Sequence, residues 1–189
     1  MHGFTENPQG LLAWDGERYG DLGIPTDDAS YDIFSQVGRA VGPQRDGPID
    51  PLGGLKVEKV VGLGASQSAA RLATYINAVH PLPPEQGGRA FDGYMLQIYF
   101  GTGAPLSASD RQTNPAAADL RLPRGQNLIR DDLDAPVMIV NTELEAISCL
   151  PVRQPDTDRF RTWEAAYADI GDLAQRLRRG DLSSIELTR

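Results

Sequence analysis

A serine flanked by small residues is the part of this sequence best suited to chemistry. Ser66 lies in the run Gly64-Ala65-Ser66-Gln67-Ser68, between a β-rich stretch at residues 57–63 and a helical pattern. A serine hydroxyl attacks a carbonyl carbon only when a base takes its proton and donors stabilise the resulting oxyanion. In a sharp turn between strand and helix, the N–H of Gln67 would be one such donor. The small Gly64 and Ser68 would let neighbouring backbone approach closely.

Two other interpretations of this turn remain open from spacing alone. Glycine-rich turns also begin phosphate-binding helices, and a turn of small residues can be purely structural. Residues 62–67 lack the third glycine of a dinucleotide fingerprint, and no Lys-Ser or Lys-Thr pair of a P-loop is present. The spacing therefore favours a nucleophilic serine over a nucleotide site and leaves the structural turn as an alternative.

The elements around the turn predict an α/β fold with a mainly parallel sheet and flanking helices. Short apolar runs at residues 57–63, 94–100 and 136–141 predict buried strands. Helical spacing predicts a helix at residues 28–41, one from Ser66 to Pro81, and an amphipathic one from Trp163 to Arg179. We expect Ser66 at the carboxyl end of a central strand, with its side chain in a pocket.

Two segments have no helical or strand periodicity. Residues 1–26 are rich in Gly, Pro and Asp and predict a lead-in loop. Residues 104–134 are long for a plain connection and predict a substrate-side or capping insertion.

Composition limits the kinds of partner and cofactor. A net charge of −8 and a pI near 4.7 argue against nucleic acid, so we expect a small-molecule or protein partner. The lone Cys149 cannot form an internal disulfide, and no Cys/His spacing indicates a metal site, so no metal or other cofactor is expected. Neither a secretory signal nor a membrane-spanning stretch is evident, which predicts a cytoplasmic protein.

Several uncommon short sequence motifs resemble those of the bacterial alpha/beta hydrolase domain family, whose substrate is unassigned. They occur in the same order over about residues 11–164, and include Tyr31-Asp32-Ile33-Phe34, Gly64-Ala65-Ser66-Gln67-Ser68-Ala69, His80-Pro81, Phe91-Asp92-Gly93, Asn141-Thr142-Glu143 and Trp163-Glu164. The resemblance implies a serine hydrolase of ester or amide bonds with Ser66 as nucleophile. It also implies an acid after Val140. Glu145 is narrowly preferred to Glu143, and either could instead be a solvated loop carboxylate.

The resemblance fails at the catalytic base. This family is expected to have a histidine shortly after the Trp-Glu word, but Trp163-Glu164 is followed by Ala165-Ala166-Tyr167-Ala168-Asp169. His80 would lie about 21 Å from Ser66 along one helix, too far for the hydrogen bond of about 3 Å that a general base needs. His2 lies in a loose terminus, and Tyr167, with an ordinary pKa near 10, would be a weak base.

The sequence therefore predicts an incomplete α/β-hydrolase fold at residues 1–168 that is inactive as this chain. The alternative function is a non-catalytic binding or partner protein on a residual hydrolase fold. Another copy or a partner chain would then cover an exposed sheet edge. Residues 170–189 resemble the N-terminal region of amidase-signature enzymes, so we expect residues 169–189 to form an amphipathic helix of divergent or fused origin.

Overall fold

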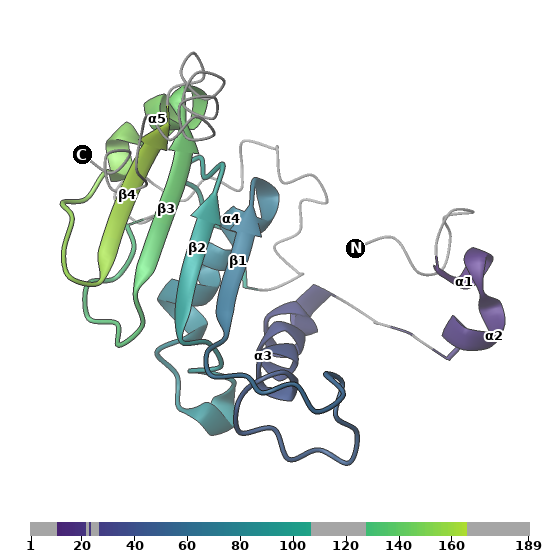
Figure 1. Cartoon of the computed structure of the whole chain (residues 1–189). Coiled ribbons are helices and arrows are strands. Elements are labelled where there is room, and N and C mark those ends of the chain that lie inside the picture. The colour runs from purple at the N-terminus through teal and green to yellow at the C-terminus, as the bar shows by residue number, and fades with distance from the viewer. Residues whose placement is uncertain (1–10, 22, 24–26, 107–127, 166–189) are drawn as a thin grey trace, which may run out of the picture.

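The computed structural model describes residues 11–21, 23, 27–106 and 128–165 (Figure 1). The helical elements in these ranges are α1 (Leu11–Trp14), α2 (Gly16–Tyr19), η1 (Asp27–Ala29), α3 (Ser30–Ala40), α4 (Gln67–Thr74), the π-helix η2 (Tyr75–Val79), η3 (Pro84–Gln86), α5 (Glu143–Cys149) and η6 (Leu150–Val152). The strands are β1 (Val61–Ala65), β2 (Gly93–Gln97), β3 (Val137–Thr142) and β4 (Phe160–Ala165).

The four strands form one parallel sheet in the order β1-β2-β3-β4. Leu63 of β1 pairs with Met95 of β2, which in turn pairs with Met138 of β3. The carboxyl ends of all four strands therefore lie at the same edge of the sheet. This arrangement confirms the predicted α/β class with a mainly parallel sheet and flanking helices.

The hydrophobic core lies between the sheet and the helical segment formed by α4 and η2, which Figure 1 shows behind the strands. Leu72 and Ile76 of this segment and Leu96 and Ile139 of the sheet are all at most 5% exposed. Each such aliphatic side chain contributes about 1.5–3 kcal/mol when it is fully buried. Burial of these side chains holds α4, and with it the turn at Ser66, against the sheet.

An aromatic cluster joins α3 to this core. The ring of Phe34 lies 4.5 Å from that of Phe91 and 5.1 Å from that of Tyr75, measured between centroids. The Tyr75 hydroxyl also hydrogen-bonds the buried Ser35 hydroxyl of α3 at 2.7 Å. The helix predicted around residues 28–41 is thus present, and its buried side packs on η2 and on the residues before β2.

The structure corrects three of the predictions. Trp163, predicted to begin a helix, lies in β4, because this segment pairs with β3 from Phe160 to Ala165. Residues 166–179 of that predicted helix lie outside the described residues. The predicted lead-in loop instead contains two short helices, α1 and α2. The Asp15 side chain caps the start of α2 by accepting a hydrogen bond from the Arg18 N–H at 3.0 Å.

The third correction concerns β1, which is an edge strand of the sheet in the described ranges and not a central one. Within the predicted insertion at 104–134, residues 107–127 lie outside the described part. No helix in the described ranges is long and apolar enough to cross a membrane.

Candidate active site

Ser66 lies at the sharp turn between β1 and α4. Its backbone has φ 56° and ψ −117°, a left-handed conformation that costs a non-glycine residue about 1–3 kcal/mol. The Ser66 N–H donates to the Gln97 carbonyl at 3.0 Å, and the Ser66 carbonyl accepts from the Ala69 N–H at 3.0 Å. These bonds tie the turn to the end of β2 and to the first turn of α4. The Ser66 side chain is exposed at the carboxyl edge of the sheet.

Gly64 and Ser68 make this turn possible in different ways. A Cβ atom on Gly64 would lie 2.5 Å from the Ser68 carbonyl oxygen and 2.8 Å from its carbonyl carbon, so no larger residue fits without a backbone shift. The Ser68 hydroxyl accepts from the Ala65 N–H at 2.8 Å and donates to the Ala65 carbonyl at 2.7 Å. Ser68 therefore closes the turn with its side chain.

Gln67 is the first residue of α4, so its N–H has no helical carbonyl to bond. The positive end of the helix dipole lies at the same place. An oxyanion held beside Ser66 would therefore meet a backbone donor and a favourable field. This arrangement is what acyl transfer from an ester or amide requires of its oxyanion site.

Both candidate acids follow β3 at the same edge as Ser66. Glu143 begins α5 and is exposed, whereas Glu145 is 3% exposed. Since neighbouring strands lie about 4.8 Å apart, the ends of β1 and β3 are separated by about 10 Å. The segments carrying Ser66 and the two carboxylates thus meet at one edge of the sheet.

The Glu145 carboxylate also has a structural role. Its Oε2 atom accepts from the Thr142 N–H at 2.9 Å and from the Thr142 hydroxyl, completing a capping box at the start of α5. Burial opposes ionisation, but the hydrogen bonds from Thr142 outweigh it and lower the pKa of Glu145. The Thr-x-x-Glu pattern at residues 142–145 is a sequence signal that would have predicted this cap.

A buried polar network that the sequence analysis missed fixes the loop after β2. Asn141 is 1% exposed, and its side chain accepts from the Tyr99 N–H at 2.8 Å and donates to the Tyr99 carbonyl at 2.9 Å. The Cys149 thiol donates to the same carbonyl at 2.8 Å, and burial raises its pKa to about 11. The network joins β3, α5 and the loop that follows β2. In the sequence, the one signal for this network was Asn141, a single polar residue at the end of an apolar strand.

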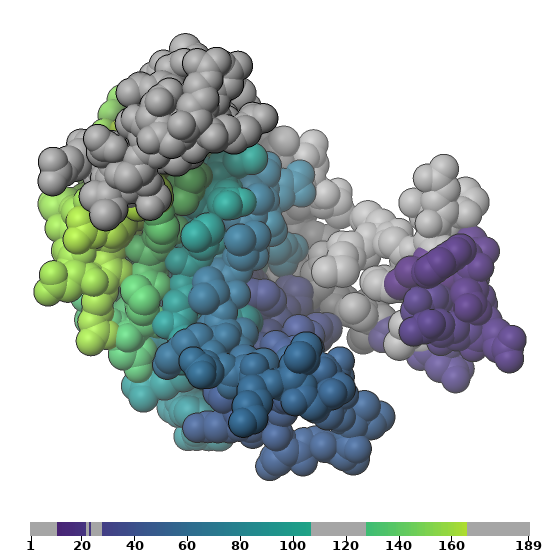
Figure 2. Space-filling view, viewed as in Figure 1, coloured from purple at the N-terminus to yellow at the C-terminus, as the bar shows by residue number. Residues whose placement is uncertain are grey.

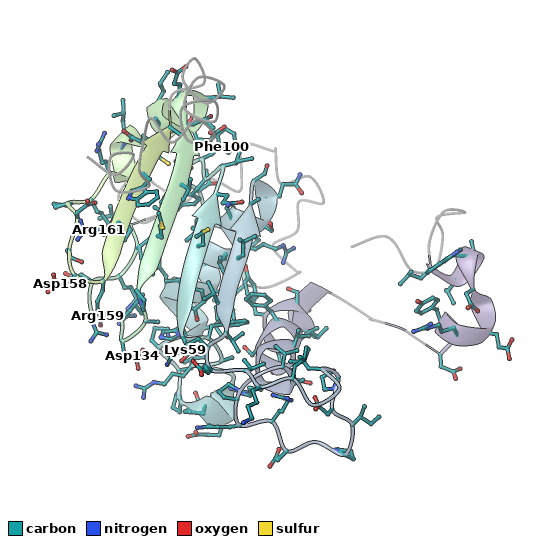
Figure 3. All side chains as sticks on the ribbon, viewed as in Figure 1. Lys59, Phe100, Asp134, Asp158, Arg159 and Arg161 are labelled. Carbon is teal, nitrogen blue, oxygen red and sulfur yellow. The ribbon has the colours of Figure 1, made fainter. Side chains whose placement is uncertain are left out.

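His80 lies at the opposite, amino edge of the sheet. Figure 3 shows this separation, with Asp134 and Lys59 at one end of the strands and Phe100 at the other. The His80 Nε2–H donates to Asp134 at 2.7 Å, and Nδ1 hydrogen-bonds the Tyr94 hydroxyl at 2.8 Å. This bond to His80 lowers the pKa of Asp134, while burial raises that of Tyr94. His80 is therefore held away from Ser66 by partners of its own.

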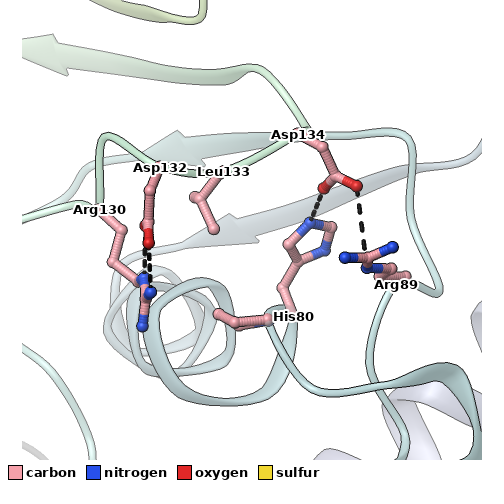
Figure 4. A pocket seen from close by; sticks show the side chains of 7 residues that line it. His80, Arg89, Arg130, Asp132, Leu133 and Asp134 are labelled. Atoms are coloured by element: carbon pink, nitrogen blue, oxygen red, sulfur yellow. Dashed lines mark hydrogen bonds and ion pairs between the residues drawn. The ribbon is translucent and has the colours of Figure 1, made fainter.

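A polar pocket surrounds this histidine (Figure 4). Its charged side chains pair with one another: Asp134 with Arg89 at 3.8 Å, and Asp132 with Arg130 at 2.6 Å. Ser66 does not line this pocket, so the expectation of a pocket at Ser66 stays a prediction. Within the described ranges, no group of three His, Cys, Asp or Glu side chains is arranged to hold a metal ion.

The carboxyl edge thus combines Ser66, Gln67 and the two glutamates, but no described histidine lies there. His2 and Tyr167 fall outside the described residues. Comparison with curated proteins and with solved structures found no match. A family model described as "Alpha/beta hydrolase domain" matches residues 3–178, which include every element from α1 to β4. The parallel sheet, the turn after β1 and this match agree, and the chain belongs to the alpha/beta hydrolase domain family.

Proposed function

We propose that this chain carries part of a serine hydrolase site for ester or amide bonds, with Ser66 as the nucleophile, and that the chain alone lacks turnover. The observation that supports this proposal best is the turn at Ser66. A positive φ of 56° in a non-glycine residue, between a parallel strand and a helix, exposes the hydroxyl at the carboxyl edge of the sheet. In open α/β sheets, this edge is where ligands bind.

The chemistry would follow from that placement. The Ser66 oxygen would attack the carbonyl carbon of the substrate, and the N–H of Gln67 would stabilise the oxyanion. The leaving alcohol or amine would depart from an acyl-enzyme, which water would then hydrolyse. Glu145 remains the first choice for the acid that orients a histidine, with Glu143 as the alternative.

The missing component is the base. A serine hydroxyl needs an acceptor within about 3 Å to lose its proton during attack. Among the described residues, no side chain hydrogen-bonds the Ser66 hydroxyl, and the described histidine is engaged by Tyr94 and Asp134. This supports the second candidate function as well: a non-catalytic binding or partner protein that retains the hydrolase sheet.

A histidine scan separates the two functions. Histidine would be introduced singly at each position from 166 to 171, directly after β4, and each variant would be assayed with p-nitrophenyl butyrate. If only the base is missing, at least one variant gains ester hydrolysis that disappears when Ser66→Ala is added. If no variant gains Ser66-dependent turnover, the hydrolase proposal is wrong and the binding function is favoured.

A further inference from the structure

The backbone of Ile98, the first residue after β2, is strained. Its φ is 51°, a value that β-branched residues rarely adopt because the Cβ then crowds the neighbouring carbonyl. In the described ranges, the non-glycine residues with a positive φ are Ser66, Arg89 and Ile98. Strain of this kind persists only where the surrounding structure imposes it, and it is commonest at active and ligand-binding sites. We therefore asked what holds Ile98 and what its side chain contacts.

Three sets of contacts hold residues 98–101 in this conformation. The Ile98 N–H donates to a carbonyl of β3 at 3.2 Å. The Asn141 side chain bonds both the N–H and the carbonyl of the next residue, Tyr99. At the far end, Gly101 packs so closely on η6 that a Cβ there would lie 2.8 Å from a side-chain carbon of that element. The loop is thus fixed at its start, in its middle and at its end.

The fixed loop buries one side chain and exposes two. Tyr99 is 1% exposed, whereas Ile98 and Phe100 on either side of it are 42% and 37% exposed. Figure 3 shows Phe100 at the carboxyl edge of the sheet, at the opposite end from Lys59 and Asp134. Two large apolar side chains are therefore held at the surface of this edge, where water contacts much of their area.

Ser66 lies directly beside this loop. Ala65 of β1 and Gln97 of β2 are the last paired residues of their strands, so Ser66 and Ile98 are the next residue on each. The Ser66 N–H donates to the Gln97 carbonyl at 3.0 Å. Since neighbouring strands lie about 4.8 Å apart, the backbones of Ser66 and Ile98 are separated by about that distance. Figure 2 shows atoms of β1 and β2, in blue and teal, side by side at the surface.

We propose that Ile98 and Phe100 form an acyl surface, which binds the carbon chain of the substrate's acyl group while its carbonyl oxygen faces the Gln67 N–H. The strained backbone of Ile98 places this surface beside Ser66. The substrate class is thus an ester or amide of an aliphatic acid. The identity of the ligand rests on the proposed function of Ser66, but the acyl surface is tested by binding and not by turnover.

Titration of the ¹⁵N-labelled full-length chain with octanoate and with butyrate tests the acyl surface. Burial of a whole methylene strengthens binding about fourfold, and a surface that covers one side of the chain gives about twofold for each. Octanoate, which is longer by four methylenes, should therefore bind about tenfold more tightly than butyrate. The amide signals of Gln67, Ile98 and Phe100 should shift with octanoate. Equal affinity for the two acids, or shifts confined to other residues, would overturn the proposal.

Replacing Ile98 by glycine separates binding from folding. Glycine adopts a φ of 51° without strain, so Ile98→Gly should unfold at no lower urea concentration than the parent. It should nevertheless bind octanoate about threefold more weakly, because part of the acyl surface is gone. Phe100→Ala, at a position without a positive φ, should weaken octanoate binding in the same way. A lower urea midpoint for Ile98→Gly with unchanged octanoate affinity would show that Ile98 serves folding alone and would overturn the proposal.

Ile49→Gly is the matched control. Ile49 is also an exposed isoleucine in a loop, at 80%, but its φ is not positive. Glycine there increases the conformational freedom of the unfolded chain without relieving strain, so this variant should unfold at a slightly lower urea concentration. Its affinity for octanoate should equal that of the parent. An equal loss of octanoate binding in Ile49→Gly and Ile98→Gly would overturn the proposal.

The acyl surface and the hydrolase proposal fail separately. Octanoate binding that depends on Ile98, with no Ser66-dependent turnover in any variant of the histidine scan, would support the acyl surface and contradict the hydrolase proposal. Turnover of p-nitrophenyl butyrate in a histidine variant, with no preference of the chain for octanoate over butyrate, would support the hydrolase proposal and overturn the acyl surface.

Discussion

Replacing Gly64 by alanine tests the geometry of the turn at Ser66. The added Cβ would lie 2.5 Å from the Ser68 carbonyl oxygen and 3.0 Å from the Ala69 nitrogen, and these are backbone atoms that cannot rotate away. Overpacking of this kind costs about 2–3 kcal/mol. Alanine also restricts the unfolded chain, which returns about 0.5–1 kcal/mol. We therefore expect Gly64→Ala to lower the free energy of unfolding by about 2 kcal/mol.

Urea denaturation followed by far-ultraviolet circular dichroism measures this effect. With a slope of about 2 kcal/mol per molar urea, the midpoint should fall by about 1 M. Gly47→Ala is the matched control, because its Cβ would meet only the Ile49 carbonyl oxygen, at 3.8 Å. That variant should be as stable as the parent or slightly more so. An unchanged midpoint for Gly64→Ala would refute the close approach between β1 and α4.

Three further predictions follow from buried groups. Because folding lowers the pKa of Glu145, its ionised form stabilises the fold above its ordinary pKa of 4.5 and loses this effect as the pH falls through the lowered value. The urea midpoints of the parent and Glu145→Gln should thus differ at pH 7 and converge toward pH 3, while Glu143→Gln should have little effect at pH 7. Tyr94→Phe leaves the buried His80 Nδ1 without its partner, so thermal denaturation should show a loss of about 1–3 kcal/mol, and an undiminished melting temperature would contradict the bond. Cys149, whose pKa is raised to about 11, should react with Ellman's reagent only on unfolding, and rapid labelling in buffer would show that the thiol is accessible.

The strand, turn and helix around Ser66 could be predicted from the sequence because each of these elements is encoded by residues next to one another in the chain. Gly64 permits the close approach, and Leu72 and Ile76 recur at helical spacing until Pro81 ends the run. The residues at which these elements begin and end were less predictable. The strand begins at Val61 and not at residue 57, because pairing with β2 starts at Gly93.

Long-range pairing explains what the sequence analysis missed. β4 has an exposed Arg161 and Trp163 on one side, and its second half, from Trp163, was predicted as a helix, since its strand character depends on pairing with β3. The partners of His80 are equally non-local: Tyr94 and Asp134 are 14 and 54 positions away in the sequence. No periodicity in the sequence connects such residues, so only the fold brings them together.

The central proposal is that Ser66 stands where a hydrolase nucleophile would stand and that no described residue supplies its base. Stopped-flow measurement of p-nitrophenol release from p-nitrophenyl butyrate, with the parent and Ser66→Ala side by side, tests it most directly. Loss of a base costs on the order of 10⁶ in turnover, so we predict no burst and the same slow rate for both proteins. A burst equal to the protein concentration in the parent, abolished in Ser66→Ala, would contradict the account and show that a base reaches Ser66.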